Sequence, residues 1–163
     1  MVRLGWAMVI SAVGGCAYNP FLPDLRTPVD RAREIAPRCH HTSEALDAEV
    51  LSASVVENVE PYYDHVQSGN DRMVHLRGAK LHVRPQPNLS AESIERSLEC
   101  HEARVTMGGA PPLASDPYTL AGTWLDIKTD STGDGFVVAV QVNNIQKARE
   151  VLARARQFAT ARP

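Results

Sequence analysis

Two of the three cysteines in the chain are followed directly by histidine. Cys39 precedes His40 and His41, and Cys100 precedes His101. Thiolate sulfur and imidazole nitrogen are donors that Zn²⁺ and copper ions prefer, so these five side chains could bind one metal ion if the fold brought them together. The chain has neither the C-x₂-C nor the H-x₃-H spacing of common zinc sites. We therefore keep a Zn or Cu site as the alternative and otherwise expect no cofactor.

No other set of residues completes a catalytic motif. The segment from His101 to Val105 begins like the helix of zinc proteases, but Val105 occupies the place of the second histidine. Gly133 and Gly135 lack the third glycine of a dinucleotide-binding turn, and the segment 130–135 lacks the alternating ligands of a calcium loop. We therefore expect no catalytic activity and interpret 130–135 as a hairpin turn.

The composition is that of one soluble domain. The chain has 163 residues, of which 44% are hydrophobic and 22% charged, with 17 Lys+Arg against 19 Asp+Glu. This near-neutral balance lacks the excess of basic groups on which sequence-independent nucleic-acid binding depends, so we expect no nucleic acid among the partners.

The first residues have the order of a secretory signal. Arg3 precedes an apolar stretch from Leu4 to Val13, and Gly14, Gly15 and Cys16 follow. An apolar stretch of about ten residues is too short to span a bilayer, which needs about 20. The pattern therefore predicts a signal segment rather than a membrane-spanning helix.

The residues Val13-Gly14-Gly15-Cys16 resemble the lipobox of bacterial lipoproteins. This resemblance implies that residues 1–15 are removed as a signal peptide and that Cys16 carries acyl chains such as palmitate. The protein would then be held at a membrane of the cell envelope through its N-terminal lipid. Ala17, in place of the aspartate that retains some lipoproteins at the inner membrane, implies the outer membrane, with the protein facing the periplasm.

Export would also decide the chemistry of the two remaining cysteines. In an oxidising compartment Cys39 and Cys100 are expected to form a disulfide, whose sulfurs can no longer act as thiolate ligands. The chain-entropy model gives a loop of this length about 4 kcal/mol of stabilisation as an upper figure. The disulfide and the metal site are therefore mutually exclusive at any one time.

The segment after Cys16 is predicted to separate the folded part from the lipid. Residues 16–38 contain four prolines and no sustained periodicity, which favours an extended tether with a short helical turn near 29–35. We expect residues 39–163 to form a single domain.

The beginning of this domain is predicted to be helical. The untidy helical pattern of residues 42–59 contains a capping box at 54–57, and 68–71 is typical of a turn. The pattern does not decide whether residues 73–76 form a further strand, or whether residues 77–78 break it. The aromatic segment 60–65 is interpreted as packing over the core.

The second half of the domain has clearer periodicity. Residues 79–83 alternate as a half-buried strand, and Ser90 begins a helix whose apolar stripe includes His101. Residues 124–129 and 136–142 are predicted strands of a hairpin, and a final helix begins near Asn143 or Asn144. The order β-α-β-β-α predicts an α+β fold with a two-layer sandwich, ferredoxin-like but incomplete, after a helical N-terminal segment.

These patterns predict a non-catalytic lipoprotein of the bacterial cell envelope that acts as a binding or structural module. Its expected partners are the membrane, through the N-terminal lipid, and another envelope protein. The alternative is a periplasm-facing metal-binding lipoprotein that uses the cysteines and histidines named above.

Overall fold

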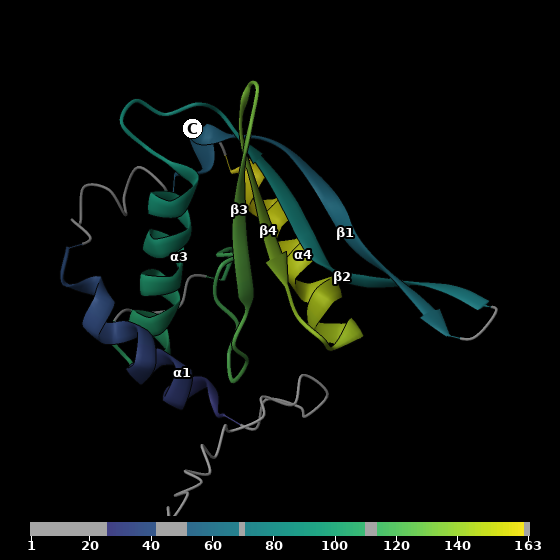
Figure 1. The fold of residues 1–163 in the computed structure, drawn as a ribbon, viewed down its shortest axis with the longest axis horizontal. Coiled ribbons are helices and arrows are strands. Elements are labelled where there is room, and N and C mark those ends of the chain that lie inside the picture. Colours follow the sequence, from purple (N-terminus) through teal and green to yellow (C-terminus); the bar gives the residue numbers. More distant parts are fainter. Residues whose placement is uncertain (1–25, 42–51, 69–70, 110–113, 162–163) are drawn as a thin grey trace, which may run out of the picture.

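The computed structural model describes residues 26–41, 52–68, 71–109 and 114–161. Within these ranges the chain forms helices α1, α3 and α4, two 3₁₀ segments, η1 and η2, and a four-stranded sheet (Figure 1). The bounds are α1 Pro28–Ile35, η1 Ala36–His41, η2 Ala53–Val55, β1 Val56–Ser68, β2 Asp71–Val83, α3 Ala91–Thr106, β3 Asp126–Thr132, β4 Gly135–Gln141 and α4 Ile145–Thr160.

The sheet is antiparallel throughout and has the strand order β1-β2-β4-β3. Side chains on a strand alternate between the two faces, so the register decides which residues meet. Leu81 of β2 lies opposite Val138 of β4, and Ala79 lies opposite Val140, which in turn lies opposite Ile127 of β3. These five apolar side chains are buried on one face, which forms the floor of the core.

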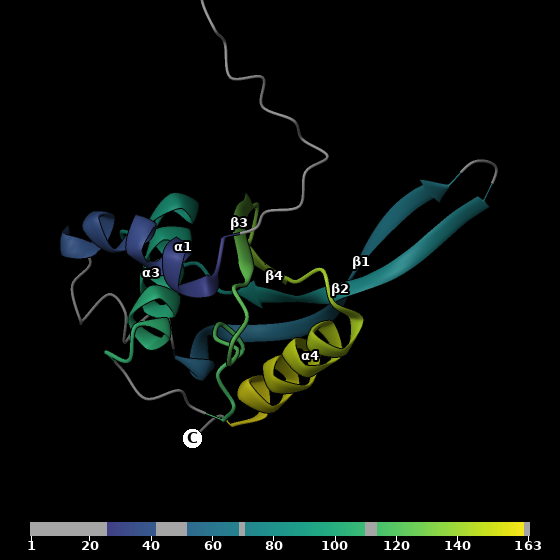
Figure 2. The ribbon, with the colours of Figure 1, turned by 90° about the horizontal axis from the view of Figure 1, so that it is seen from below.

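Helices α3 and α4 bury their apolar residues against this face. Ile94 and Leu98 of α3 and Val151 and Ala155 of α4 belong to the same hydrophobic cluster as the strand residues. Figures 1 and 2 show α3 beside β3 and α4 across β1 and β2. The chain is therefore an α+β protein in which both helices cover one face of an antiparallel sheet.

Two glutamates of α3 also close the outer edge of the sheet. Glu95 Oε2 accepts a hydrogen bond from the backbone N–H of Thr129 at 2.8 Å, and Glu102 Oε1 accepts one from Leu125 at 2.6 Å. The two glutamates are seven residues apart and therefore share one side of the helix. Covering an edge strand in this way removes donors that would otherwise be open to pairing with another chain.

The hairpin of β1 and β2 extends beyond the rest of the sheet. The last pair that joins β2 to β4 is Gly78 with Gln141, whereas β1 and β2 remain paired as far as Ser68 and Asp71. This two-stranded arm projects away from the helices in both views (Figures 1 and 2). Its side chains Tyr63 and Val74 are exposed.

Helix α1 occupies part of the segment that the sequence favours as a tether. Thr27 caps its first turn, with the reciprocal hydrogen bonds to Asp30 that define a capping box. The side chain of Ala32 is fully buried where α1 packs on α3. The short helical turn expected near 29–35 is thus present, and the folded structure includes residues 26–41.

The elements of the second half are confirmed with shifted ends. Ser90 caps α3, Asn144 caps α4, and the predicted hairpin is formed by β3 and β4 with a turn at 133–134. The undecided segment 73–76 belongs to β2.

The helical pattern predicted for residues 42–59 is wrong from residue 53 onward. Ala53–Val55 is a 3₁₀ turn and Val56 begins a strand, so no helix follows the capping box at 54–57. Tertiary pairing with β2 overrides the local capping signal. The predicted helix over 42–51 lies outside the described residues. The aromatic segment 60–65 lies in β1, where Tyr63 is 49% exposed, so packing of the whole segment over the core is also wrong.

None of the helices in the described ranges is both long enough and apolar enough to cross a membrane.

Candidate ligand-binding pocket

The structure joins the two candidate cysteines. Cys39 in η1 and Cys100 in α3 form a disulfide with an Sγ–Sγ distance of 2.06 Å across 61 residues of sequence. The disulfide expected from the sequence is therefore present, and it attaches η1 to the middle of α3. Cys16 lies outside the described residues.

Of the five candidate metal ligands, the structure describes the side chains of Cys39, Cys100 and His101, and it joins the two cysteines to each other rather than to His101. The backbone of His40 and His41 belongs to η1, but their side chains lie outside the described part. His101 Nε2 instead forms a 2.7 Å hydrogen bond with Asp116 Oδ2. Among the residues that the structure describes, no three His, Cys, Asp or Glu side chains are placed to hold a metal ion.

The His101–Asp116 pair is part of a buried polar network. Asp116 also accepts hydrogen bonds from the Tyr118 N–H and the Thr119 hydroxyl, both at 2.8 Å. Arg154 donates to the Thr119 carbonyl at 3.1 Å. A histidine and a carboxylate form two parts of a hydrolytic triad, but the Thr119 hydroxyl donates to the aspartate rather than facing the imidazole. The network holds the segment before Leu120 against α3 and α4.

Glu102 has a structural role in place of the protease-like role that its neighbours suggest. Its side chain is almost fully buried, and its Oε2 has no hydrogen-bond partner among the described residues. Burial raises the pKa of Glu102 well above its usual value, although the hydrogen bond from Leu125 opposes this shift. Burial thus favours the protonated form of this glutamate more than exposure to solvent would, and its Oε1 stabilises the segment before β3.

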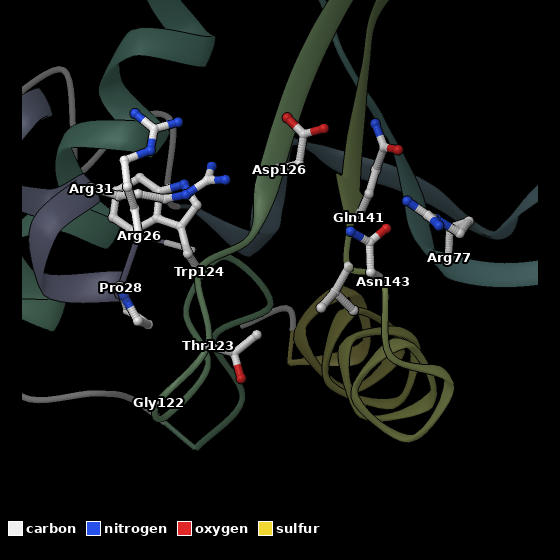
Figure 3. A pocket seen from close by; sticks show the side chains of 11 residues that line it. Arg26, Pro28, Arg31, Arg77, Gly122, Thr123, Trp124, Asp126, Gln141 and Asn143 are labelled. Carbon is white, nitrogen blue, oxygen red and sulfur yellow. The ribbon is translucent and has the colours of Figure 1, made fainter. Parts of the chain in front are cut away.

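A polar pocket lies where α1, β2, β3 and β4 converge. It has a volume of about 400 Å³. Figure 3 shows Arg26, Arg31 and Trp124 on one side and Gln141, Asn143 and Arg77 on the other. The remaining lining residues are Pro28, Gly122, Thr123, Asp126 and Val142.

The backbone of β2 places Arg77 in this pocket. The register of β1 with β2 shifts between Tyr62 and Tyr63, so Arg77 is an extra residue without a pairing partner on β1. Its carbonyl accepts a 2.8 Å hydrogen bond from the Val142 N–H. Gly78 has a φ of 150°, and a Cβ there would lie 2.0 Å from the Val140 carbonyl oxygen. The bulge and the glycine thus fix the position from which the Arg77 side chain leaves the strand.

The pocket is lined by several charged side chains. Arg26, Arg31 and Arg77 line it together with the carboxylate of Asp126, and Arg26 is ion-paired with Glu34. Gln141 and Asn143 add amide donors and acceptors, and Trp124 adds an aromatic surface. Such a set of groups suits hydrogen bonding and charge pairing with a small polar ligand.

The amino-acid sequence alone does not predict this pocket. Arg26 and Arg31 are close in sequence, but Arg77 and Trp124 lie far along the chain from them and from each other. The available signal was Arg77-Gly78 directly before an alternating strand, because a glycine within a strand pattern often marks a bulge. From the sequence alone, these two residues indicate only a break.

Comparison of the chain with protein-family models, with curated proteins and with solved structures gave no match. The class of protein that the fold defines is an α+β domain with an internal disulfide and a polar pocket.

Proposed function

We propose that the protein is a lipid-anchored component of the bacterial cell envelope whose α+β domain is a non-catalytic binding module. Cys16 carries the anchor, and the domain faces the periplasm from the outer membrane. The membrane is one partner, through the lipid, and another envelope component is the second.

The observation that carries this proposal is the Cys39–Cys100 disulfide. Structural disulfides persist in exported proteins, whereas reducing systems keep cytosolic thiols reduced. The disulfide is thus consistent with the secretory order of residues 3–16. The two features lie in different parts of the chain and support the same compartment.

The non-catalytic part of this proposal is supported by the polar groups of the described residues. The His101–Asp116 pair is held in a network that fixes the fold, and Glu102 accepts a hydrogen bond from a backbone N–H. The polar pocket offers groups for binding, and no hydrogen bond between the Thr123 hydroxyl and the Asp126 carboxylate is recorded among its lining residues.

The anchor is tested by replacing Cys16 in the bacterium that makes the protein. We expect Cys16→Ser to move the protein from the membrane fraction to the soluble fraction and to abolish labelling with palmitate. Ser11→Ala is the control, because it changes the same segment outside the four lipobox residues. Separation of inner and outer membranes then tests the location. A Cys16→Ser protein that stays equally membrane-bound would exclude the anchor.

The alternative is a Zn or Cu site at Cys39, Cys100 and some of His40, His41 and His101. This alternative requires the reduced protein, since a disulfide sulfur is not a thiolate ligand. Native and denatured intact masses of protein purified without reductant or chelator, with a count of titratable thiols, separate the two forms. Stoichiometric metal that disappears in Cys39→Ser would support the metal site, and two missing thiols without metal would exclude it.

We also infer that the fold is a rearranged ferredoxin-like sheet. In that fold a β-α-β-β-α unit is followed by a fourth strand, which pairs with the first. Here β1 precedes the unit and pairs with β2, which supports an equivalent position for β1. Interstrand contacts measured by nuclear magnetic resonance test this inference, and a sheet without β2–β4 pairing would contradict it.

A further inference from the structure

We propose that the pocket between α1, the middle of β2, the start of β3 and the end of β4 binds a small anionic ligand whose carboxylate or phosphate oxygens contact the Arg77 guanidinium. This inference deepens the proposed binding module and rests on it for the role of the domain. The ligand is defined by its oxyanion and by a size that the pocket of about 400 Å³ can hold.

The Arg77 side chain has a polar atom without a partner among the described residues. It is half-buried, and its Nε is shielded from solvent without a hydrogen-bond partner in the described part of the chain. The structure records no ion pair for this guanidinium among the described residues, whereas the half-buried Arg154 pairs with Glu150 at 2.8 Å. A buried donor left without a partner lowers the stability of the fold, and a charged group does so more strongly. An oxyanion bound in the pocket would offset this cost.

The backbone of Arg77 is held in place by the fold. The Val142 N–H donates to its carbonyl, and Gly78 permits the approach of the β2 backbone to Val140. A binding residue whose backbone is already ordered has only its side chain left to order when a ligand binds, which lowers the entropic cost. The β-bulge at Arg77 is therefore consistent with a binding site, since bulges often redirect a side chain.

The remaining lining suits an anion held by Arg77. Across the pocket from Arg77 lie Arg31 and the ring of Trp124, and Asn143 adds an exposed amide beside β4 (Figure 3). Arginine pairs with carboxylate and phosphate oxygens through two parallel hydrogen bonds. Arg26 is ion-paired with Glu34, whereas no described residue forms an ion pair with Arg77. The charge of Arg77 thus favours an anion over a cation or a neutral sugar.

Trp124 provides a local probe for this binding. The chain contains two tryptophans, Trp6 and Trp124, and Trp6 lies in the segment that signal processing is expected to remove. Trp6→Phe ensures that Trp124, which lines the pocket, is the one indole in a chain that keeps this segment. This protein is titrated with inorganic phosphate, citrate, succinate and, as the neutral comparison, glucose. We expect at least one of the anions to change the Trp124 fluorescence saturably, and we expect this change to weaken as salt is added.

Substitutions then test which residue binds. In the same Trp6→Phe background, Arg77→Gln should weaken the anion that binds by about tenfold or more, equivalent to about 1.4 kcal/mol. Arg149→Gln, which removes an exposed arginine of α4 that does not line the pocket, should leave binding unchanged. If Arg77→Gln does not fold, Asn143→Asp takes its place, because a second carboxylate at the exposed rim should repel the anion.

Several outcomes would overturn the inference. These are no response to any anion, equal responses to glucose and the anions, and unchanged affinity in a folded Arg77→Gln protein or, where that variant does not fold, in Asn143→Asp. Binding of phosphate or of a carboxylate supports the inference, and the anion that binds shows which of the two oxyanions the pocket takes. A negative titration does not affect the result for Cys16→Ser, so failure of this inference and failure of the proposed anchor are distinguishable.

Discussion

At the scale of the residue, Glu102 carries the clearest electrostatic cost in the fold. Its carboxyl is 1% exposed and receives one backbone hydrogen bond, while Glu99 and Asp116 add unfavourable charge and Arg31 opposes them. Burial raises the pKa of Glu102, so the folded chain keeps a proton that the unfolded chain releases near pH 4.5. The contribution of Glu102 to stability is therefore greatest below that pH and falls as pH rises.

The substitution Glu102→Gln should remove this part of the pH dependence, because glutamine accepts the Leu125 hydrogen bond without a proton to lose. At pH 7 we expect the midpoint of thermal unfolding to rise by at least about 3 °C, the change that about 1 kcal/mol produces in a domain of this size. Thermal unfolding from pH 4 to 8 measures the slope. Glu92→Gln, at an exposed position of α3, is the control. If the unfolding temperature of Glu102→Gln varied with pH as that of the wild type does, the raised pKa of Glu102 would be contradicted.

At Gly78 the lack of a Cβ atom allows the close approach of β2 to β4. A methyl group there would meet the Val140 carbonyl oxygen and would also hold a φ of 150° that side chains disfavour. We expect Gly78→Ala to lower the free energy of unfolding by about 2 kcal/mol or more. Gly133→Ala, whose Cβ would have no neighbour within 4 Å, should change it by less than about 0.5 kcal/mol. Urea unfolding of both variants tests the contrast.

At the scale of the element, β2 changes its surroundings along its length. Residues 79–83 pair with β1 on one side and β4 on the other, whereas residues 73–76 pair with β1 alone. The outer half also lacks the cover of the apolar cluster, and Met73 and Val74 are exposed. One strand thus combines a buried segment and a projecting one.

Hydrogen exchange should show this division directly. We expect backbone amides of residues 73–76 to exchange at least about 100-fold faster than those of residues 79–83, because opening of the arm breaks few buried contacts. Nuclear magnetic resonance under native conditions measures both rates in the same sample. Equal protection in the two segments would show that the arm is stabilised by more than its own pairing.

At the scale of the whole molecule, the disulfide joins the N-terminal α1–η1 segment to the helix–sheet core. It closes a loop over 61 residues of sequence, and α1 also packs on α3 close to the same place. A cross-link between distant segments reduces the freedom of the unfolded chain more than it changes the folded one.

Reduction should therefore destabilise the protein strongly. We expect Cys39→Ala/Cys100→Ala to lower the free energy of unfolding by up to about 4 kcal/mol. Urea unfolding with and without reductant is the measurement. The double variant is its own control, since added reductant should not affect its unfolding. Equal midpoints for the oxidised wild type and this variant would contradict a stabilising disulfide.

Much of the second half of the fold was predictable because its signals are local. Ser90 and Asn144 supply hydrogen bonds to the helix N-termini that follow them, and the glycine-rich turn before Phe136 permits a hairpin. The first half was not predictable in the same way. Val56–Ser68 has a local helix-capping signal at its start, yet pairing with β2 makes it a strand.

The sequence by itself determined the α+β class, the helix and hairpin boundaries near their caps and turns, and the two cysteines available for pairing. These features depend on periodicity, capping and composition, which act over a few residues. Only the tertiary structure decided that His101 bonds with Asp116, that Glu102 closes the edge before β3, and that Arg77 lines a pocket with Trp124. Each of these contacts joins residues on different elements, and its geometry depends on strand order and register rather than on the local pattern.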